Sequence, residues 1–505
     1  MRISGKVLLL LPGENGSRGM MQDWADWALD TAKSRGATYA DVRVMDIRHR
    51  DLSTKNGQVG NLSESQSLGL GIRALAGGSW GFAATDRLTR EGISACAAEA
   101  VSIARASALA KLHDVSMVPE QAYVDTWQNP FVKDPFRVPM EKQLDLLLAA
   151  DAEMRKVKGV TLAETSMAFR RIDQLFASTI GSRIHQTRVQ SGAGIVATTF
   201  AGTEIQKRSY PNSFGGQHML AGYELVESLD LVENAQRVGE EAVALHSAIQ
   251  CPEGTKTIIL DSSQLGLQIH ESIGHPVELD RVLGMEANFA GMSFLTLEKL
   301  NTLKYGSDIV NVVADARLAH GSGLGTFGYD DEGVPAQCTD IIKDGMFRGY
   351  LSNRETAASV GLNRSGGTMR TEGWNRLPII RMTNISIHPG EWKYDDLIAD
   401  TDDAIYMETN RSWSIDDRRY HFQFSTEIGW EIKGGKKGRM IKHPSYSGIT
   451  TEFWNSCDAI CSREHWTLWG TPNCGKGQPM QTMGTGHGAS PARFKNMRVG
   501  VAFAK

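Results

Sequence analysis

The segment HESIGH, residues 270–275, contains the side chains of this sequence that are best suited to chemistry. It resembles the zinc-binding pattern H-E-x-x-H, in which two histidines bind the metal and the glutamate acts as a base. Here one additional residue separates the histidines. Because each residue of a regular helix turns by ~100°, His270 and His275 would lie about 140° apart. A regular helix therefore cannot bring both imidazoles to one ion.

A local distortion of the helix would remove this difficulty. A π-type turn has i→i+5 hydrogen bonds and places residues that are five apart on one face. Gly274 gives the backbone freedom just before His275, and Pro276 lacks the N–H that would bond the carbonyl of Ser272. We therefore predict that the helix is irregular between Ser272 and Pro276.

Two histidines do not complete a zinc site, because a catalytic zinc typically has three protein ligands and one open position. The best third candidate is Cys474 in TPNCGKGQP, where glycines allow close approach. Glu271 would then act as the base and not as a ligand, as the glutamate of H-E-x-x-H does. The alternative is that the histidine pair is a hydrogen-bonded or solvated cluster without a metal.

Other residues are weaker candidates for the site. Cys457, Cys461 and His465 form a rival set with four-residue spacing in SCDAICSREHW, but it lacks an acid or base, so buried packing is the better interpretation. His487, in the Gly-rich segment GTGHGASPARF, could lie near the metal. The segment GSGLGTFG, residues 321–328, has the G-x-G-x-x-G spacing without the strand and helix that a dinucleotide site needs, so we predict a flexible loop.

The chain segments before HESIGH alternate between helical and strand patterns. Residues 1–20 are predicted to be a disordered extension, because the run VLLLL is shorter than a signal-peptide core of roughly 7–15 residues. In the next region, residues 21–115, QDWADWALDTAKSRG predicts a helix, and strands follow with turns at Asn56-Gly57 and Gly77-Gly78. A proline-rich connector then leads into a second α/β region, residues 116–251.

The last region, residues 252–505, is rich in Gly, Thr and Trp and contains many short strand-like runs. We expect it to form an extensive antiparallel β structure. Within it, Asp261 and Gln264 resemble a capping box at the start of a helix, and Leu265, Ile269 and Ile273 recur every fourth residue. The predicted fold is therefore α+β, with N-terminal α/β regions followed by a large β-rich catalytic domain that carries the metal-binding helix.

Composition limits the function classes. A formal net charge of −4 gives no reason to expect nucleic-acid binding, and no apolar run approaches the ~20 residues that span a bilayer. Six cysteines do not form a disulfide framework, so we interpret Cys96 and Cys251 as structural thiols. The protein is predicted to be cytoplasmic, with neither a nucleic-acid nor a membrane partner.

The sequence resembles the TldD/PmbA family of zinc metallopeptidases over nearly its whole length after Met20. The resemblance rests on YADVRV, GLGIRALAGGSWGFA, HESIGHPVELDRVLGMEANFAG, YDDEGVPA, PIIRMTN and NCGKGQP, in this order. An intact H-E-x-x-x-H is typical of the TldD-like catalytic branch, since PmbA-like partners lack it. Only the segment around Cys457 and Cys461 departs from the family pattern.

The resemblance implies a site and an assembly. It assigns His270, His275 and Cys474 as ligands of Zn²⁺ and Glu271 as the acid/base that activates the zinc-bound water. Arg281, Arg381 and His487 are candidates for stabilising the oxyanion. Family members form two-domain subunits that pair into dimers, either with a metal-free PmbA-like paralogue or as homodimers, and they cleave unfolded or small peptides inside an enclosed chamber. An extended peptide could lie along a strand edge of the β-rich domain.

Two other functions stay open at this stage. The same zinc could serve a specialised enzyme that matures one peptide natural product. Alternatively, the chain could be a non-catalytic binding or regulatory protein, because family members have also been described as modulators of DNA gyrase. A bound zinc together with turnover that depends on Glu271 would exclude the regulatory alternative.

Overall fold

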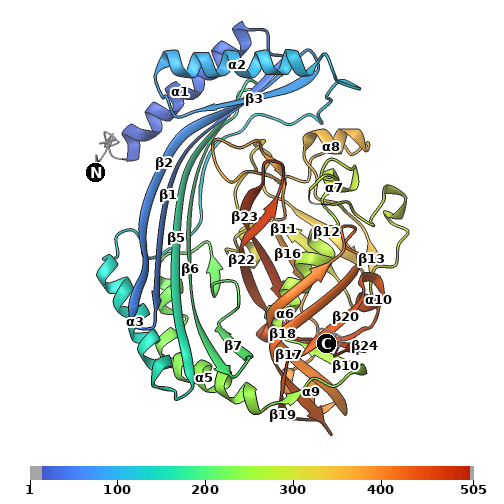
Figure 1. Cartoon of the computed structure of the whole chain (residues 1–505). Coiled ribbons are helices and arrows are strands. Elements are labelled where there is room, and N and C mark those ends of the chain that lie inside the picture. Colours follow the sequence, from blue (N-terminus) through green and yellow to red (C-terminus); the bar gives the residue numbers. More distant parts are fainter. Residues whose placement is uncertain (1–13, 290, 501–505) are drawn as a thin grey trace.

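The computed structural model describes residues 14–289 and 291–500, which form two connected parts (Figure 1). The first part is a long curved sheet with helices at both of its ends. The second part is a β-rich domain that lies against the concave side of this sheet. The predicted α+β fold, with an N-terminal α/β region before a β-rich C-terminal domain, is confirmed.

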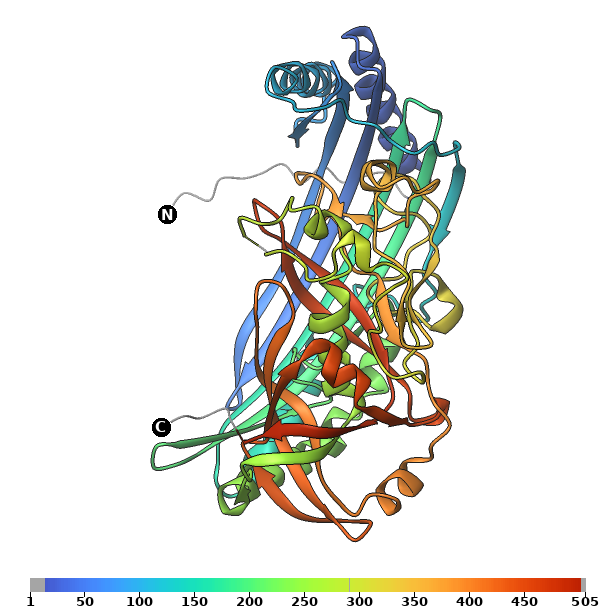
Figure 2. The ribbon, with the colours of Figure 1, turned by 90° about the vertical axis from the view of Figure 1, so that its right-hand side faces the viewer.

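The N-terminal sheet has eight strands in the order β3-β2-β1-β5-β6-β4, and β7 and β8 also pair with β6. Its long strands β2, β1, β5 and β6 pair with one another in antiparallel fashion and extend along much of the molecule (Figure 2). The predicted turn at Asn56-Gly57, where both residues have positive φ, joins the first two strands. The strands are β1 (Tyr39–Lys55), β2 (Gln58–Ala76), β3 (Ser79–Thr85), β4 (Val124–Gln128), β5 (Val160–Ser178), β6 (Arg183–Ala201), β7 (Glu204–Tyr210) and β8 (Gln217–Met219).

Helices cover the two ends of this sheet (Figure 1). At one end, Trp24 and Ala28 are buried in an apolar cluster shared by two helices and the strands beneath them. Gly36, with a φ of +87°, follows the first helix. The helices are α1 (Glu14–Ser34) and α2 (Arg90–Ser107) at this end, and α3 (Met140–Lys156), α4 (Glu224–Glu227) and α5 (Leu231–Ala244) at the other.

The N-terminal predictions need one correction. Helix α1 begins at Glu14, so residues 14–20 of the predicted disordered extension are helical. Met20 packs against the apolar cluster beneath α1 and α2, which gives this first part of the helix tertiary support. Residues 1–13 lie outside the described residues. The strands on both sides of residue 115 belong to one sheet, and the proline-rich connector contains strand β4, which pairs with β6.

The first sheet of the C-terminal domain has eight strands in the order β17-β10-β24-β20-β18-β19-β9, with β21 paired to β24. Because β17 also pairs with β18, part of this order closes on itself. Most of its pairs are antiparallel, as predicted, but β10 lies parallel to β17 and β9 parallel to β19. The strands are β9 (Ile249–Gln250), β10 (Gly254–Leu260), β17 (Asp403–Ile415), β18 (His421–Lys433), β19 (Lys436–Lys442), β20 (Ser445–Ile449), β21 (Cys457–Ile460) and β24 (Ala492–Val499).

The second sheet has six strands in the order β13-β12-β11-β16-β23-β22, and it ends in the long hairpin β22–β23. Its strands are β11 (Val312–Asp315), β12 (Cys338–Lys343), β13 (Met346–Phe347), β16 (Asn384–Ile387), β22 (Thr467–Lys476) and β23 (Gln481–Ala489). A separate two-stranded ribbon and short helices complete the domain. They are β14 (Met369–Arg370), β15 (Ile379–Ile380), α7 (Leu279–Val282), α8 (Arg354–Ser359), α9 (Tyr394–Ala399) and α10 (Thr450–Asn455).

Helix α6 (Ser262–Ile269) packs between these two sheets, against β17 on one side and against β16, β22 and β23 on the other. The predicted stripe of Leu265, Ile269 and Ile273 is fully buried in the largest apolar cluster. Every residue from 262 to 274 is buried, so the sheets and loops cover the helix on all sides. The HESIGH motif therefore lies at the centre of the C-terminal domain.

Among the described helices, none combines the length and the apolar character that crossing a membrane requires.

Candidate metal centre

The end of helix α6 has the distortion that the motif predicts. Residues His270–Gly274 form a π-helical turn, in which the N–H of His275 donates to the carbonyl of His270 at 3.1 Å. This i→i+5 bond brings the two imidazole rings to a centroid distance of 4.8 Å. A Cβ at Gly274 would come within 2.1 Å of the sulfur of Met382, so only glycine fits the turn as it stands. The predicted irregularity is confirmed.

The start of the same helix is fixed by the predicted cap. The carboxylate of Asp261 accepts hydrogen bonds from the backbone N–H groups of Ser263 and Gln264. The second half of a capping box is not formed, because the side chain of Gln264 donates to the hydroxyl of Tyr446. That hydroxyl in turn donates to Gln268, one turn along the helix. Helix α6 is therefore anchored by buried polar groups before it reaches the histidines.

Cys474 reaches the histidines from strand β22. Its Sγ lies 3.6 Å from Nε2 of His275, and a register irregularity before Cys474 interrupts the pairing with β23. The guanidinium of Arg381 donates to the Cys474 carbonyl at 2.6 Å and helps to hold the strand in place. One donor atom from each of His270, His275 and Cys474 lies within 4.8 Å of the others. Cys474 thus joins a cluster with two histidines that lie 199 or more positions earlier in the sequence.

The hydrogen bonds behind the histidines determine which ring nitrogens face this cluster. Nδ1 of His487 lies 3.3 Å from the carbonyl of Ile385, which can only accept, so Nδ1 of His487 carries the proton. Nε2 of His487 then accepts from Nδ1–H of His270 at 2.7 Å. In the same way, Nδ1–H of His275 donates to Glu278 at 3.0 Å. Both ligand candidates therefore keep the lone pair of Nε2 free.

The donor set fits a zinc ion. Two imidazole nitrogens and one cysteine sulfur are usual zinc ligands, with bonds of about 2.0–2.1 Å to nitrogen and 2.3 Å to sulfur. In tetrahedral geometry these bond lengths place nitrogen and sulfur about 3.6 Å apart, and the distance from Nε2 of His275 to Sγ of Cys474 is 3.6 Å. The three side chains are at most 5% exposed. That these residues bind a metal remains a prediction.

The local electrostatics favour the protonation states that a metal requires. Burial lowers the pKa of His270 to about 4 and also lowers the pKa of His275, so both rings are neutral at neutral pH. Burial alone would raise the pKa of the Cys474 thiol, but Arg381 and His275 bring it below its ordinary value. A neutral imidazole and a thiolate are the forms that bind metal ions.

Glu278 is the centre of a charged network behind His275. Burial would raise the pKa of its carboxyl, but Lys476 and His275 hold that pKa well below its usual range. Lys476 lies 3.4 Å from Glu278 and 2.7 Å from Asp280. Because Lys476 belongs to strand β22, this network connects the histidine segment to the strand that carries Cys474.

The proposed base Glu271 faces a cation from another part of the domain. One oxygen of its carboxylate accepts a hydrogen bond from Nη1 of Arg419 at 2.6 Å. Arg419 lies in the turn between β17 and β18 and has a φ of +65°. Glu271 is 5% exposed and directly follows His270. The arginine thus holds the Glu271 carboxylate in a fixed position beside the histidine cluster.

The rival candidates do not form a second site. Cys457 lies in strand β21 and Cys461 follows it, so their four-residue spacing is not helical. Both are buried, and burial raises the pKa of the Cys461 thiol to about 11, which is typical of a packed cysteine. Cys96 and Cys251 are also buried, which agrees with a structural role. The predicted loop at 321–328 contains no helix or strand.

Sequence reasoning missed three residues of this centre: Glu278, Arg419 and Lys476. Glu278 had a local signal, since it follows His275 by three residues and could be expected to bond its ring. Lys476 follows Cys474 by two residues in the glycine-rich segment, but the sequence does not indicate which residues it contacts. Arg419 could not be found from spacing, because 148 residues separate it from Glu271.

The contact between His487 and His270 yields a first prediction. We expect His487→Ala to weaken zinc binding by about 10–100-fold, because the Nδ1 bond that orients His270 is lost. Competition with a zinc chelator of known affinity measures the effect. The exposed His421 provides a control, since His421→Ala removes a histidine outside the cluster. Equal zinc affinity in the wild type and His487→Ala would contradict an orienting role.

A buried histidine near the hairpin predicts how stability depends on pH. His218 in strand β8 is buried, and burial lowers its pKa to about 4 from an ordinary 6.5. Between these values the unfolded chain binds more protons, so the free energy of unfolding falls as the pH falls. This group contributes a loss of about 1.4 kcal/mol per pH unit. Denaturant unfolding gives the free energy of unfolding at several values between about pH 5 and 6. Plotted against pH, this free energy should change less steeply in His218→Gln than in the wild type, by that amount. Identical slopes in the two proteins would refute the expectation.

Comparisons with known proteins identify the family of this chain. The models "PmbA/TldA metallopeptidase domain 1" and "PmbA/TldA metallopeptidase C-terminal domain" match residues 40–104 and 253–501. A protein of Methanothermobacter thermautotrophicus named "Metalloprotease" is 30% identical over 92% of this chain and 95% of its own length. A "Zinc metalloprotease TldD homolog" of Saccharolobus solfataricus is 24% identical over 41% of this chain and 44% of its own.

A solved structure shows the same fold. It is that of a Thermotoga maritima protein named as a candidate modulator of a DNA gyrase. The two structures superpose with a TM-score of 0.76 at 17% identity, over 95% of this chain and 100% of that one. At this identity the likeness concerns the fold alone.

Proposed function

The chain belongs to the PmbA/TldD family of metallopeptidases, and on this premise we propose that it hydrolyses unfolded or small peptides with a zinc ion. The observation that carries the proposal is the cluster of His270, His275 and Cys474, with Glu271 adjacent to it on the same π-helical turn. Two neutral imidazoles and a cysteine sulfur leave one position of a tetrahedral zinc open for chemistry.

The proposed reaction divides the work between the metal and this chain's own residues. Bound zinc would supply a Lewis acid that acidifies a water molecule and polarises the scissile carbonyl. Glu271 would accept the proton of the attacking water and pass it to the leaving amine. Arg419 would direct the carboxylate of Glu271 during both proton transfers.

Of the arginines near the centre, Arg419 is the best placed to donate to the oxyanion of the peptide. The oxyanion candidates predicted from the sequence, Arg281, Arg381 and His487, already bond Glu278, the Cys474 carbonyl and His270 respectively. They are at most 1% exposed, so they support the ligands and do not face a substrate. The side chain of Arg419 is 17% exposed beside Glu271. It could therefore reach a peptide that lies against the glutamate.

The proposal includes the assembly that the family resemblance implies. We propose that the chain works as a dimer, with a metal-free PmbA-like paralogue or with a second copy of itself, and that peptides are cleaved in the enclosed space of that dimer. Native mass spectrometry of the purified chain, alone and after coexpression with such a paralogue from the same genome, distinguishes the two assemblies. A chain that is monomeric and fully active would remove the dimer from the proposal.

One experiment tests the activity. The purified protein, with its partner subunit where one is found, is incubated with a library of unfolded peptides, and the products are identified by mass spectrometry. We expect cleavage that stops after zinc is removed with a chelator and returns when zinc is added. Cleavage that is unaffected by complete zinc removal would refute the proposal. A single cleaved peptide would point to the specialised maturation enzyme, and binding without turnover to a regulatory protein.

A further inference from the structure

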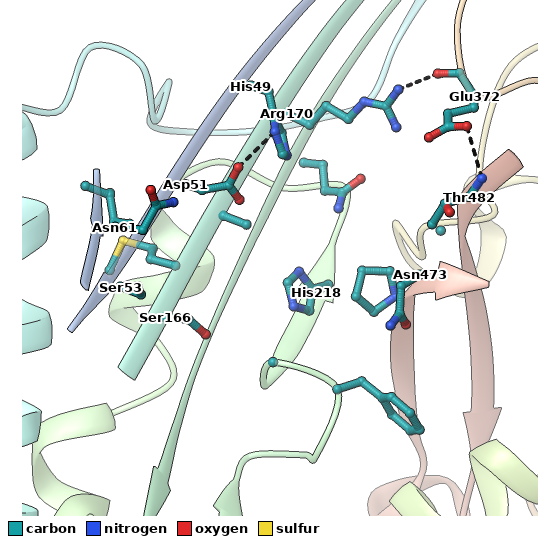
Figure 3. Close-up of a pocket in the computed structure, with 18 of the residues that line it drawn as sticks. His49, Asp51, Ser53, Asn61, Ser166, Arg170, His218, Glu372, Asn473 and Thr482 are labelled. Carbon is teal, nitrogen blue, oxygen red and sulfur yellow. Dashed lines mark hydrogen bonds and ion pairs between the residues drawn. The ribbon is translucent and has the colours of Figure 1, made fainter. Parts of the chain in front are cut away.

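A large cavity lies between the N-terminal sheet and the hairpin β22–β23 (Figure 3). Its volume is about 840 Å³, which lies within the range of roughly 300–1,000 Å³ for sites of small ligands. Asn473 lines this cavity, whereas the next residue, Cys474, faces His275. The hairpin therefore separates the cavity from the metal centre, and one short strand segment contributes to both.

A smaller cavity of about 30 Å³ adjoins the large one. The two share the lining residues Arg170, Gln190 and Gly484. One water needs roughly 10–15 Å³ on the same measure, so the inner cavity has room for a small polar group. Three arginines line it: Arg170 from β5, Arg188 from β6 and Arg370 from β14. Three cations around such a small space are unusual unless an anion accompanies them.

Neutral groups are the hydrogen-bond partners of these arginines. Nε of Arg188 and Nε of Arg370 are buried and have no hydrogen-bond partner among the described protein groups. Within the described residues, none of the three guanidinium groups forms an ion pair with a carboxylate. Their hydrogen bonds go to the carbonyl of Glu372 from Arg170, to the amide oxygen of Gln174 from Arg188, and to the carbonyls of Leu324, Met382 and Gly484 from Arg370.

Two acidic residues offset part of this charge, but neither forms an ion pair with the three guanidinium groups. Glu372 lines the large cavity and acts to raise the pKa of Arg170, while its carboxylate accepts from the backbone N–H of Thr482. Buried Asp331 acts to raise the pKa of Arg188 and of Arg370, and one of its oxygens accepts from Gln174. Burial and the neighbouring Arg188 lower the pKa of Arg170 to about 10 and that of Arg370 to about 9. The folded chain thus holds cations together whose mutual repulsion a bound anion would relieve.

We propose that Arg170, Arg188 and Arg370 form an oxyanion site, and that a peptide in the adjoining cavity places a carboxylate there. A guanidinium presents its N–H groups as a planar fork that matches a carboxylate or a phosphate. The cavity of about 840 Å³ gives space for the residues that precede such a carboxylate. The site deepens the peptidase function proposed above and in this respect rests on it. The three arginines would select peptides that carry an acidic group, and they are separate from the residues that cleave the peptide.

Binding can be measured without turnover in the Glu271→Gln variant. Calorimetric titrations would use inorganic phosphate at constant ionic strength, and a five-residue peptide of neutral side chains as the free acid and as its C-terminal amide. We expect phosphate to bind, and the free acid to bind at least about tenfold more tightly than the amide. Adding Arg188→Gln should weaken the binding of phosphate at least about tenfold. It should also remove the preference for the free acid over the amide. Adding Arg183→Gln is the matched control, because Arg183 lies on the same strand and is already paired with Asp26.

Thermal unfolding separates an anion site from a structural role. Without phosphate, Arg188→Gln should keep or raise the Tm, because it removes one of three clustered cations. A purely structural Arg188 would lower the Tm when it is replaced. Phosphate binding without any preference for the free acid would support the oxyanion site and identify a free anion as its occupant. Equal binding of phosphate by the Arg188→Gln and Arg183→Gln proteins would overturn the site. Intact binding in a protein that hydrolyses no peptide would count against the proposed function alone.

Discussion

Replacement of Glu271 by glutamine is expected to abolish peptide hydrolysis and to leave the zinc content unchanged. Glutamine has nearly the same shape as glutamate, and its side-chain oxygen can still accept the hydrogen bond from Arg419, which is 2.6 Å in the wild type. It cannot take a proton from water. Since general base catalysis contributes about 10²–10⁴-fold, the loss in kcat/KM should be at least of that order.

The measurement combines initial rates of peptide cleavage with elemental analysis of the same protein preparations. Exposed Glu298 provides a matched control, because Glu298→Gln makes the same chemical change away from the site. Wild-type rates in the Glu271→Gln protein would remove Glu271 from the mechanism. Zinc loss in that variant would instead make Glu271 a ligand.

The distortion of the metal-binding helix could be predicted because its causes are local. The spacing of His270 and His275 is incompatible with a regular helix, and Gly274 and Pro276 supply the freedom and the missing donor beside them. The structure has an i→i+5 bond at this place. The same holds for the Asp261 cap and for the turn at Asn56-Gly57, each determined by neighbouring residues. Features that depend only on neighbouring residues can therefore be predicted from the sequence alone.

Contacts between distant segments could not be predicted from the sequence in this way. Arg419 lies in a turn whose sequence, DDRRY, looks like any solvated turn, and only the pairing of β17 with β18 carries it to Glu271. The single N-terminal sheet is a similar case, because the pairing of β1 with β5 joins strands more than 100 residues apart. The pattern of apolar residues predicts that each strand exists but not which strand is its neighbour.

Strand β22 is held against the histidine segment by buried charges as well as by apolar packing. Lys476 lies 2.7 Å from Asp280 and donates to the carbonyl of Ile380, and Arg381 donates to the carbonyl of Cys474. Removing one partner of such a buried pair leaves an uncompensated charge, at a cost of about 3–5 kcal/mol. The position of Cys474 is therefore fixed by the fold before any metal binds. Because Cys474 already lies in this position, zinc can bind it without a rearrangement of the strand.

This preformed geometry leads to the expectation that the wild type binds one zinc per chain and that Cys474→Ala binds almost none. The variant loses one of three proposed protein ligands, so its affinity should fall by more than the roughly 10–100-fold typical of residues that only orient a ligand. His270→Ala and His275→Ala should behave alike, because each histidine contributes one donor atom to the same cluster. Cys461→Ala, at a buried cysteine outside the cluster, should keep its zinc.

Stability gives an independent measure of the same site. A ligand that binds only the folded chain at a thousand times its Kd stabilises it by about 4 kcal/mol, so a chelator should lower the Tm of the wild type and of Cys461→Ala. Cys474→Ala should show the lower Tm from the outset and no further response to the chelator. If Cys474→Ala retained a full zinc equivalent and lost Tm on chelation, the third ligand would not be Cys474. No other described residue completes a set of three donors with His270 and His275, so such a result would mean that the hairpin moves when the metal binds.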